Sequence, residues 1–136
     1  MIIGIDPDLS ESGIACLHDN KLIEFSTLGF VETLKFIRLN QPILKAVYLE
    51  AGWLNKKSSW HAAKNNAIAS RIGKNVGENH ATGKLLQQCI EAEGVKVILC
   101  KPTTKKLDAS AFKTWTKITQ RTNQEMRDAI MLVFGR

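Results

Sequence analysis

The stretch IIGIDPDLSESGIACLHDNKLIEF, residues 2–25, is the most informative part of the chain for its fold. Its first apolar run, Ile2–Ile5, ends at Asp6–Pro7, because proline cannot donate to a sheet and restrains the residue before it. Two more short apolar runs lie on either side of Asp19–Asn20, a pair suited to a tight hairpin turn. The pattern predicts three short strands in an antiparallel meander.

Beyond the meander, helical and extended patterns alternate along the chain. The expected elements are strands over 45–49 and 95–99, helices over 30–39, 61–93 and 109–117, and a last helix from Thr122. The 61–93 stretch is either one long helix or two helices with a break near Gly77–Gly83. Thr122 and Glu125 have the spacing of a capping box. The order of elements indicates one α/β domain over residues 1–136.

Length, charge and cysteine content bound the class of protein. The chain has 136 residues, 44% of them apolar and 24% charged, as expected for one globular domain. The net charge of +6 favours a polyanionic partner without requiring one. The three cysteines have no C-x-x-C spacing, which argues against a zinc knuckle or a disulfide scaffold. No apolar run is long enough to cross a membrane, and the first residues lack the basic region of a secretory signal, so we expect a cytoplasmic protein without a membrane partner.

Four carboxylates stand at positions where the expected fold brings distant segments together. Asp6 ends the first strand and Glu50 ends the fourth, so the two converge if those strands are parallel neighbours. Glu125 and Asp128 are three residues apart and therefore share one helical face. Clustered carboxylates suit Mg²⁺ or Mn²⁺, and two such ions can hydrolyse a phosphodiester. Each acid also has a structural alternative, as a turn residue, a capping residue or a solvated helix charge.

Three short motifs resemble those of one nuclease family. They are G-I-D-P at 4–7, Y-L-E at 48–50 and Q-E-M-R-D-A at 124–129, and in this order they resemble the RuvC-like Holliday junction resolvases, particularly the short phage-type branch. The resemblance implies a ribonuclease H-like fold: a mixed five-stranded sheet in the order 3-2-1-4-5, flanked by helices. It also implies a bacterial or phage-infected host cell. Asp8 stands where the family usually has Gly, and Glu125 where it often has Asp.

The same resemblance implies an activity and a set of catalytic residues. Members resolve four-way DNA junctions by paired symmetric nicks, and a two-fold homodimer suits that task. By resemblance, the catalytic and metal-binding residues are Asp6, Glu50, Glu125 and Asp128, with two Mg²⁺ or Mn²⁺ ions in each active site. The longer arm of Glu125 still reaches a metal and can change the preference between the two ions.

Aromatic and basic residues near the expected acids are candidates for DNA binding. Trp53 follows Glu50 by three residues, where the family often places an aromatic that stacks into the opened junction, and Trp60 lies further along the same loop. The basic candidates are Lys56, Lys57, Lys105, Lys106 and Lys113. The resemblance implies two lysines that grip phosphate near the scissile bond, the first being either Lys105 or Lys106 and the second Lys113. A buried aromatic and a solvated basic face would give the same pattern.

Other functions stay open at the level of sequence. The glycines of 73–84 lack phosphate-loop spacing and do not follow a strand, so no nucleotide cofactor is expected. A sugar kinase or actin-like ATPase would need two such domains. A nuclease acting on flaps or RNA–DNA hybrids and a non-catalytic junction-binding module both remain compatible with the residues.

Overall fold

The computed structural model describes residues 1–55, 66–103 and 105–136. Within these residues, five strands and four α-helices follow one another in the predicted order, with short 3₁₀ turns at Gln41–Ile43 and Gly52–Leu54. The strands are β1 (Ile2–Asp6), β2 (Ser12–His18), β3 (Lys21–Leu28), β4 (Ala46–Glu50) and β5 (Val97–Cys100). The helices are α1 (Phe30–Asn40), α2 (Asn66–Ala92), α3 (Ala109–Thr116) and α4 (Gln124–Val133).

The strands form one mixed sheet in the order β3-β2-β1-β4-β5, which confirms the predicted topology. β1, β2 and β3 are the expected antiparallel meander, whereas β4 and β5 run parallel to β1. Asp19 and Asn20 both have positive φ, 48° and 61°, as a two-residue hairpin turn of this hand requires. Ile5 pairs with Leu49, so the next residues along the two strands are Asp6 and Glu50.

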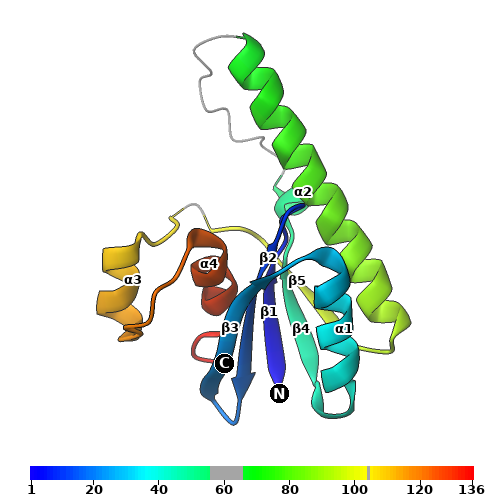
Figure 1. Ribbon diagram of the computed structural model, residues 1–136, viewed down its shortest axis with the longest axis vertical. Helices are drawn as coiled ribbons and strands as arrows, with labels where there is room; N and C mark the ends of the chain where they lie inside the picture. The colour runs from blue at the N-terminus through cyan, green and yellow to red at the C-terminus, as the bar shows by residue number, and fades with distance from the viewer. Residues whose placement is uncertain (56–65, 104) are drawn as a thin grey trace.

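Helices cover both faces of the sheet and create two hydrophobic cores (Figure 1). On one face, α1 and α2 pack Ile37, Leu86 and Ile90 against alternate residues of β1 and β4. On the other face, α4 and α3 contribute Ile130 and Phe112 to a second core. Both cores are built mainly from isoleucine, leucine, valine and phenylalanine, as expected for a sheet buried on both faces.

Helix α4 lies unusually close to the strands because two of the positions beneath it are glycine. A Cβ atom on Gly4 would collide with the carbonyl oxygen of Ala129, and one on Gly13 with that of Glu125. Any larger residue would push the helix away from the sheet. These two glycines therefore set the height of α4 and of every side chain that it carries above β1 and β2.

The sequence left the architecture of the 61–93 stretch open, and the described part is one unbroken helix. α2 runs from Asn66 to Ala92 through Gly77 and Gly83 without a break. Its N-terminal half projects past the carboxyl ends of the strands (Figure 1). Gly83 packs against Trp53 and Pro7.

One local prediction was wrong. Asn123, and not Thr122, is the N-cap of α4, and its side chain accepts a 2.8 Å hydrogen bond from the backbone N–H of Met126. Thr122 instead accepts hydrogen bonds from Arg127, at its carbonyl (3.1 Å) and at its hydroxyl (3.3 Å). The expected capping box with Glu125 therefore does not form, and Glu125 is left facing a cavity. None of the described helices has the length and hydropathy needed to cross a membrane.

Candidate active site

All four predicted carboxylates line one cavity of about 630 Å³ at the carboxyl ends of β1 and β4. Asp6 and Glu50 lie there because their strands are adjacent and parallel. Glu125 and Asp128 reach the same cavity from the first turns of α4, whose close approach depends on Gly13. The prediction that these four residues share a pocket is met by the geometry.

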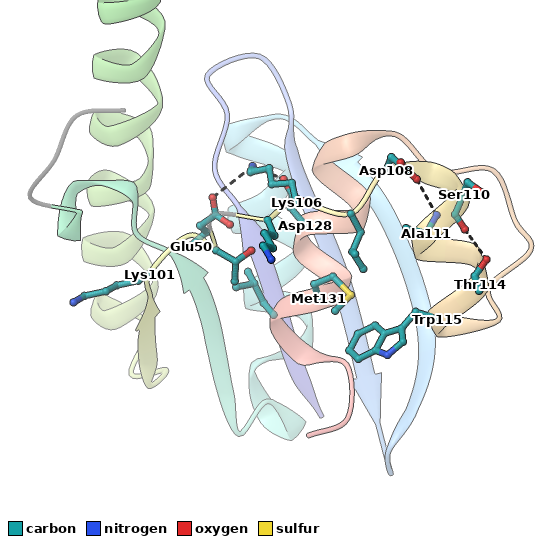
Figure 2. A pocket seen from close by; sticks show the side chains of 14 residues that line it. Glu50, Lys101, Lys106, Asp108, Ser110, Ala111, Thr114, Trp115, Asp128 and Met131 are labelled. Carbon is teal, nitrogen blue, oxygen red and sulfur yellow. Dashed lines mark hydrogen bonds and ion pairs between the residues drawn. The ribbon is translucent and has the colours of Figure 1, made fainter. Parts of the chain in front are cut away.

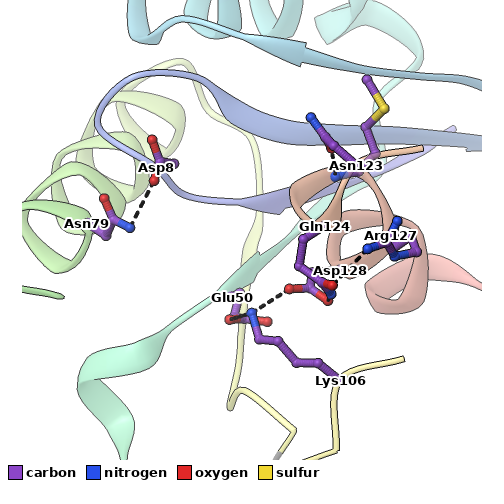
Figure 3. Close-up of polar contacts among 9 residues, drawn as sticks. Asp8, Glu50, Asn79, Lys106, Asn123, Gln124, Arg127 and Asp128 are labelled. Atoms are coloured by element: carbon purple, nitrogen blue, oxygen red, sulfur yellow. Dashed lines mark hydrogen bonds and ion pairs between the residues drawn. The ribbon is translucent and has the colours of Figure 1, made fainter. Parts of the chain in front are cut away.

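Lys106 lies among the carboxylates. Its ammonium nitrogen donates a short hydrogen bond to Oδ2 of Asp128 and lies 3.8 Å from Oε1 of Glu50 (Figure 3). Asp128 is buried, with only 7% of its side chain exposed, so the ammonium is its main compensating charge. Of the two lysines that the sequence offered for this position, Lys106 meets the acids and Lys105 lies outside this cavity.

The electrostatics of the cavity favour binding of positive charge. Burial raises the pKa of Asp6 from 3.8 to about 8, and the nearby charges of Glu50, Asp128 and Glu125 add to the effect while Lys106 opposes it. Burial also raises the pKa of Glu50, again with Lys106 acting in the opposite direction. For Lys106, burial lowers the pKa, but the hydrogen bond to Asp128 and the charges of Asp6 and Glu50 raise it above 10.5 overall. The carboxylates thus repel one another and are only partly neutralised by one lysine.

The donor set has the chemistry of a divalent metal site. Carboxylate oxygens are the ligands that Mg²⁺ and Mn²⁺ prefer, and the pKa of Asp6 is raised first by burial and then by the charge of Glu50. Among the described residues, however, no three His, Cys, Asp or Glu side chains converge tightly enough to hold an ion as they stand. Lys106 stands between Glu50 and Asp128, so an ion shared by that pair would displace its ammonium group.

Gln124 and Arg127 complete the site, and sequence reasoning did not assign them a role. The Gln124 amide donates a 2.7 Å hydrogen bond to Oδ1 of Asp128, and its carbonyl oxygen accepts a 2.9 Å bond from Arg127. Arg127 is fixed in turn by the Thr122 carbonyl. This chain of contacts holds Asp128 from the side opposite to Lys106 (Figure 3). The i, i+4 spacing of Gln124 and Asp128 was the available signal.

Asp8, the departure from the resolvase pattern, has a structural task. Its Oδ1 accepts hydrogen bonds from the backbone of Ser10 (2.8 Å) and Glu11 (3.4 Å). Its Oδ2 accepts a 3.0 Å bond from Asn79 on α2. Asp8 therefore folds the β1–β2 loop and ties it to α2 at the rim of the cavity.

The DNA-binding candidates are distributed unevenly. Trp53 is half-buried, lines the cavity, and packs its ring against Gly83 and edge-on to His80, with 6.2 Å between ring centroids. The ammonium of Lys84 lies 5.9 Å from the centre of the Trp53 ring. Lys113 is exposed on α3. Lys56, Lys57 and Trp60 fall outside the described residues.

A comparison with solved structures supports the fold. The structure of T. thermophilus RuvC in complex with a Holliday junction substrate matches 98% of this chain and 89% of its own chain, with a TM-score of 0.54 and 15% sequence identity. No protein-family model matches the chain, and neither does any curated protein sequence. At this identity the likeness concerns the fold, which is the ribonuclease H-like fold that the sheet order 3-2-1-4-5 defines.

Proposed function

We propose that this protein is a metal-dependent endonuclease that resolves four-way DNA junctions by paired symmetric nicks. The observation that carries the proposal is the convergence of Asp6, Glu50, Glu125 and Asp128, from two strands and one helix, on one cavity with Lys106 beside them. The fold is shared with a RuvC whose solved structure contains a Holliday junction substrate. Fold alone does not define an activity, so the carboxylates and the lysine carry more of the argument than the likeness does.

In the proposed mechanism, Asp6, Glu50 and Asp128 would hold two Mg²⁺ or Mn²⁺ ions, with Glu125 beside them. The chemistry that the ions supply is polarisation of the phosphodiester, activation of the attacking water and stabilisation of the leaving oxygen. Gln124 keeps Asp128 oriented through the 2.7 Å hydrogen bond to Oδ1. Lys106, released from Asp128, donates to a non-bridging oxygen of the scissile phosphate. The Lys106 ammonium would thus pair with the carboxylates in the free protein and with the phosphate in the DNA complex.

A four-way junction as substrate determines which oligomeric state and which DNA-contacting residues we propose. Each chain offers one cavity with the four acids, so cutting two strands of one junction requires two chains, and we propose a homodimer. Trp53 at the cavity rim would stack on a base at the opened junction. Lys105 and Lys113, together with Lys56 and Lys57, would contact phosphates, which gives affinity without sequence choice.

One observation favours a second candidate, a non-catalytic junction-binding module. Lys106 already pairs with Glu50 and Asp128, as it would in a structural ion-pair network that never holds a metal. Cleavage separates the two readings, because a module binds a junction and leaves it intact.

The test is a cleavage panel. The purified protein is incubated with a four-way junction, a linear duplex, a flap and an RNA–DNA hybrid, with Mg²⁺, with Mn²⁺ and with a chelator, alongside Asp6→Asn. We expect paired nicks in the junction only, dependent on metal and lost in the variant. Preferential cutting of flap or hybrid would make the protein a nuclease of another substrate class. Junction binding without cleavage by either protein would support the module.

A further inference from the structure

A second cavity, of about 860 Å³, opens beside the acidic one (Figure 2). The two cavities share Glu50, Lys106 and Asp128. The remaining walls come from Lys101, Thr103 and residues 105–108, from α3 and from α4. We call this second cavity the α3 groove. Because the cavities share three residues, a polymer held at the carboxylates can continue directly into the α3 groove.

The side of the α3 groove away from the carboxylates is apolar. Its apolar wall consists of Leu107, Ala111, Trp115, Met131 and Leu132. Trp115 is 61% exposed, an unusual degree for the largest apolar side chain. Phe134 contacts it, with 5.5 Å between ring centroids and 42° between ring planes, so the indole is supported while much of its surface stays open. Such a ring is a flat, pre-ordered platform for another aromatic group.

The rim of the α3 groove carries positive charge that the protein itself does not neutralise. In the described parts of the chain, neither Lys101 nor Lys105 lies within ion-pair distance of a carboxylate. The acidic member of the same wall, Asp108, caps α3 by accepting a 2.8 Å hydrogen bond from the backbone N–H of Ala111. The negative charge of Asp108 therefore interacts with the N-terminus of α3. The lysines remain available to an anionic ligand.

We propose that the α3 groove binds unpaired nucleotides of the strand that passes through the active site, with a base on Trp115 and phosphates on Lys101 and Lys105. The α3 groove is lined both by an exposed indole and by lysines without a carboxylate partner, which match the two parts of a single strand, its aromatic bases and its phosphates. A duplex hides its base faces and fits this wall poorly. The inference rests on the proposed function, because the shared wall with Glu50 and Asp128 is what directs the same strand into the α3 groove.

The first test measures binding in a chelator, so that cleavage plays no part. The affinities of a labelled oligothymidine of about twelve nucleotides and of a hairpin duplex are compared for wild type, Trp115→Ala and Trp115→Phe. A matched control is Leu39→Ala, because Leu39 is 80% exposed on α1, on the opposite face of the sheet. We expect Trp115→Ala to weaken single-strand binding about tenfold, since stacking on one base is worth about 1–3 kcal/mol. Trp115→Phe and the control should stay within about threefold of wild type.

Three results would overturn the inference. The first is unchanged single-strand binding by Trp115→Ala, and the second is an equal loss on duplex and single strand. The third is a change in sedimentation of the DNA-free Trp115→Ala variant, which would make the α3 groove a protein–protein contact. Thermal melting of each variant verifies that the fold is kept, which is expected for an exposed side chain.

A crosslinking experiment locates the base. Iodouracil is placed at successive positions of one junction strand, the complex is irradiated in a chelator, and the crosslinked peptide is identified by mass spectrometry. We expect one or two positions next to the junction centre to crosslink to Trp115, and no crosslink there from any position would count against the inference. If the junction is bound but never cut by wild type, the proposed function fails while the affinity test still decides the role of Trp115. If the junction is cut and Trp115→Ala binds normally, only the inference about the α3 groove fails.

Discussion

Replacing Asp6 by asparagine should stabilise the metal-free protein, and the gain should grow with pH. The pKa of Asp6 is raised from 3.8 to about 8, chiefly by burial and then by the charge of Glu50. Folding therefore favours the protonated acid, whereas the unfolded chain ionises at its ordinary pKa. Below about pH 4 both states are protonated and nothing is lost. As the pH rises toward 8, the wild type loses stability that Asp6→Asn retains, and above 8 the difference is constant.

The size of the effect follows from the pKa. Moving a carboxyl from a pKa of 3.8 to about 8 corresponds to about 5–6 kcal/mol when the group is ionised. This value is an upper bound for two reasons. The cavity rearranges around a charge, and burying the asparagine amide without a dedicated hydrogen-bond partner also costs free energy. We therefore expect Asp6→Asn to be more stable by about 2–4 kcal/mol at pH 8 and by less than about 1 kcal/mol at pH 4.

The assay is urea denaturation in a chelator, at several values from about pH 4 to about pH 9, for wild type and Asp6→Asn. A matched control is Glu24→Gln, which removes one carboxylate from an exposed position on β3. Groups that do not interact with Asp6 titrate alike in both proteins and cancel in the difference, whereas Glu50 and Lys106, whose charges act on Asp6, contribute to it. A difference that is flat across this range, or that shrinks as the pH rises, would refute the electrostatic description of the cavity.

Three further predictions concern the parts of the site. Lys106→Met should bind Mn²⁺ more tightly than wild type by about tenfold in calorimetry, because Glu50 and Asp128 lose their competing ammonium; weaker binding would show that the lysine does not compete with metal. Gln124→Ala should lower kcat about tenfold with little change in KM, since Asp128 loses the donor that orients it; a raised KM with an unchanged kcat would instead point to a role in DNA binding. Gly13→Ala should destabilise the protein by about 1–3 kcal/mol in urea, because its Cβ collides with the backbone of α4. The control Gly73→Ala faces open space in α2 and should be neutral or stabilising; similar losses in both would contradict the packing argument.

The meander and the strand ends that carry Asp6 and Glu50 could be predicted from local signals, whereas the full sheet order and the set of four acids followed from the resemblance to the RuvC-like resolvases. The Asp6–Pro7 stop, the Asp19–Asn20 turn and the strand at 45–50 are each readable from a few residues. Parallel pairing of β1 and β4 then forces Asp6 and Glu50 to one edge of the sheet. The three-residue spacing of Glu125 and Asp128 places both on one face of α4, and in the structure both line the same cavity.

The rest depends on contacts between segments far apart in the chain. Lys105 and Lys106 are indistinguishable in a basic loop, and only the path of that loop brings Lys106 to Asp128, 22 residues away. The structural role of Asp8 could not be predicted from the sequence, because its partner Asn79 is 71 residues distant. The capping prediction was wrong because Thr122 and Asn123 are both favourable N-cap residues. In the structure, Arg127 donates a hydrogen bond to the Thr122 hydroxyl, and Asn123 accepts the capping hydrogen bond from the backbone N–H of Met126. The exposure of Trp115 could not be predicted from the sequence either, because short amphipathic helices usually bury their aromatic side chains.

The central claim is that two copies of this site cut one junction in a paired manner, and a cruciform plasmid tests it most directly. An inverted repeat extrudes a four-way junction only while the plasmid is supercoiled, so the first nick releases the torsion that maintains the junction. Linear product therefore requires both strands to be cut within the lifetime of one complex. We predict Mg²⁺-dependent conversion of supercoiled plasmid to linear product, absent for Asp6→Asn and absent without the repeat. Nicked circles alone, or equal cutting of a plasmid without the repeat, would contradict the account.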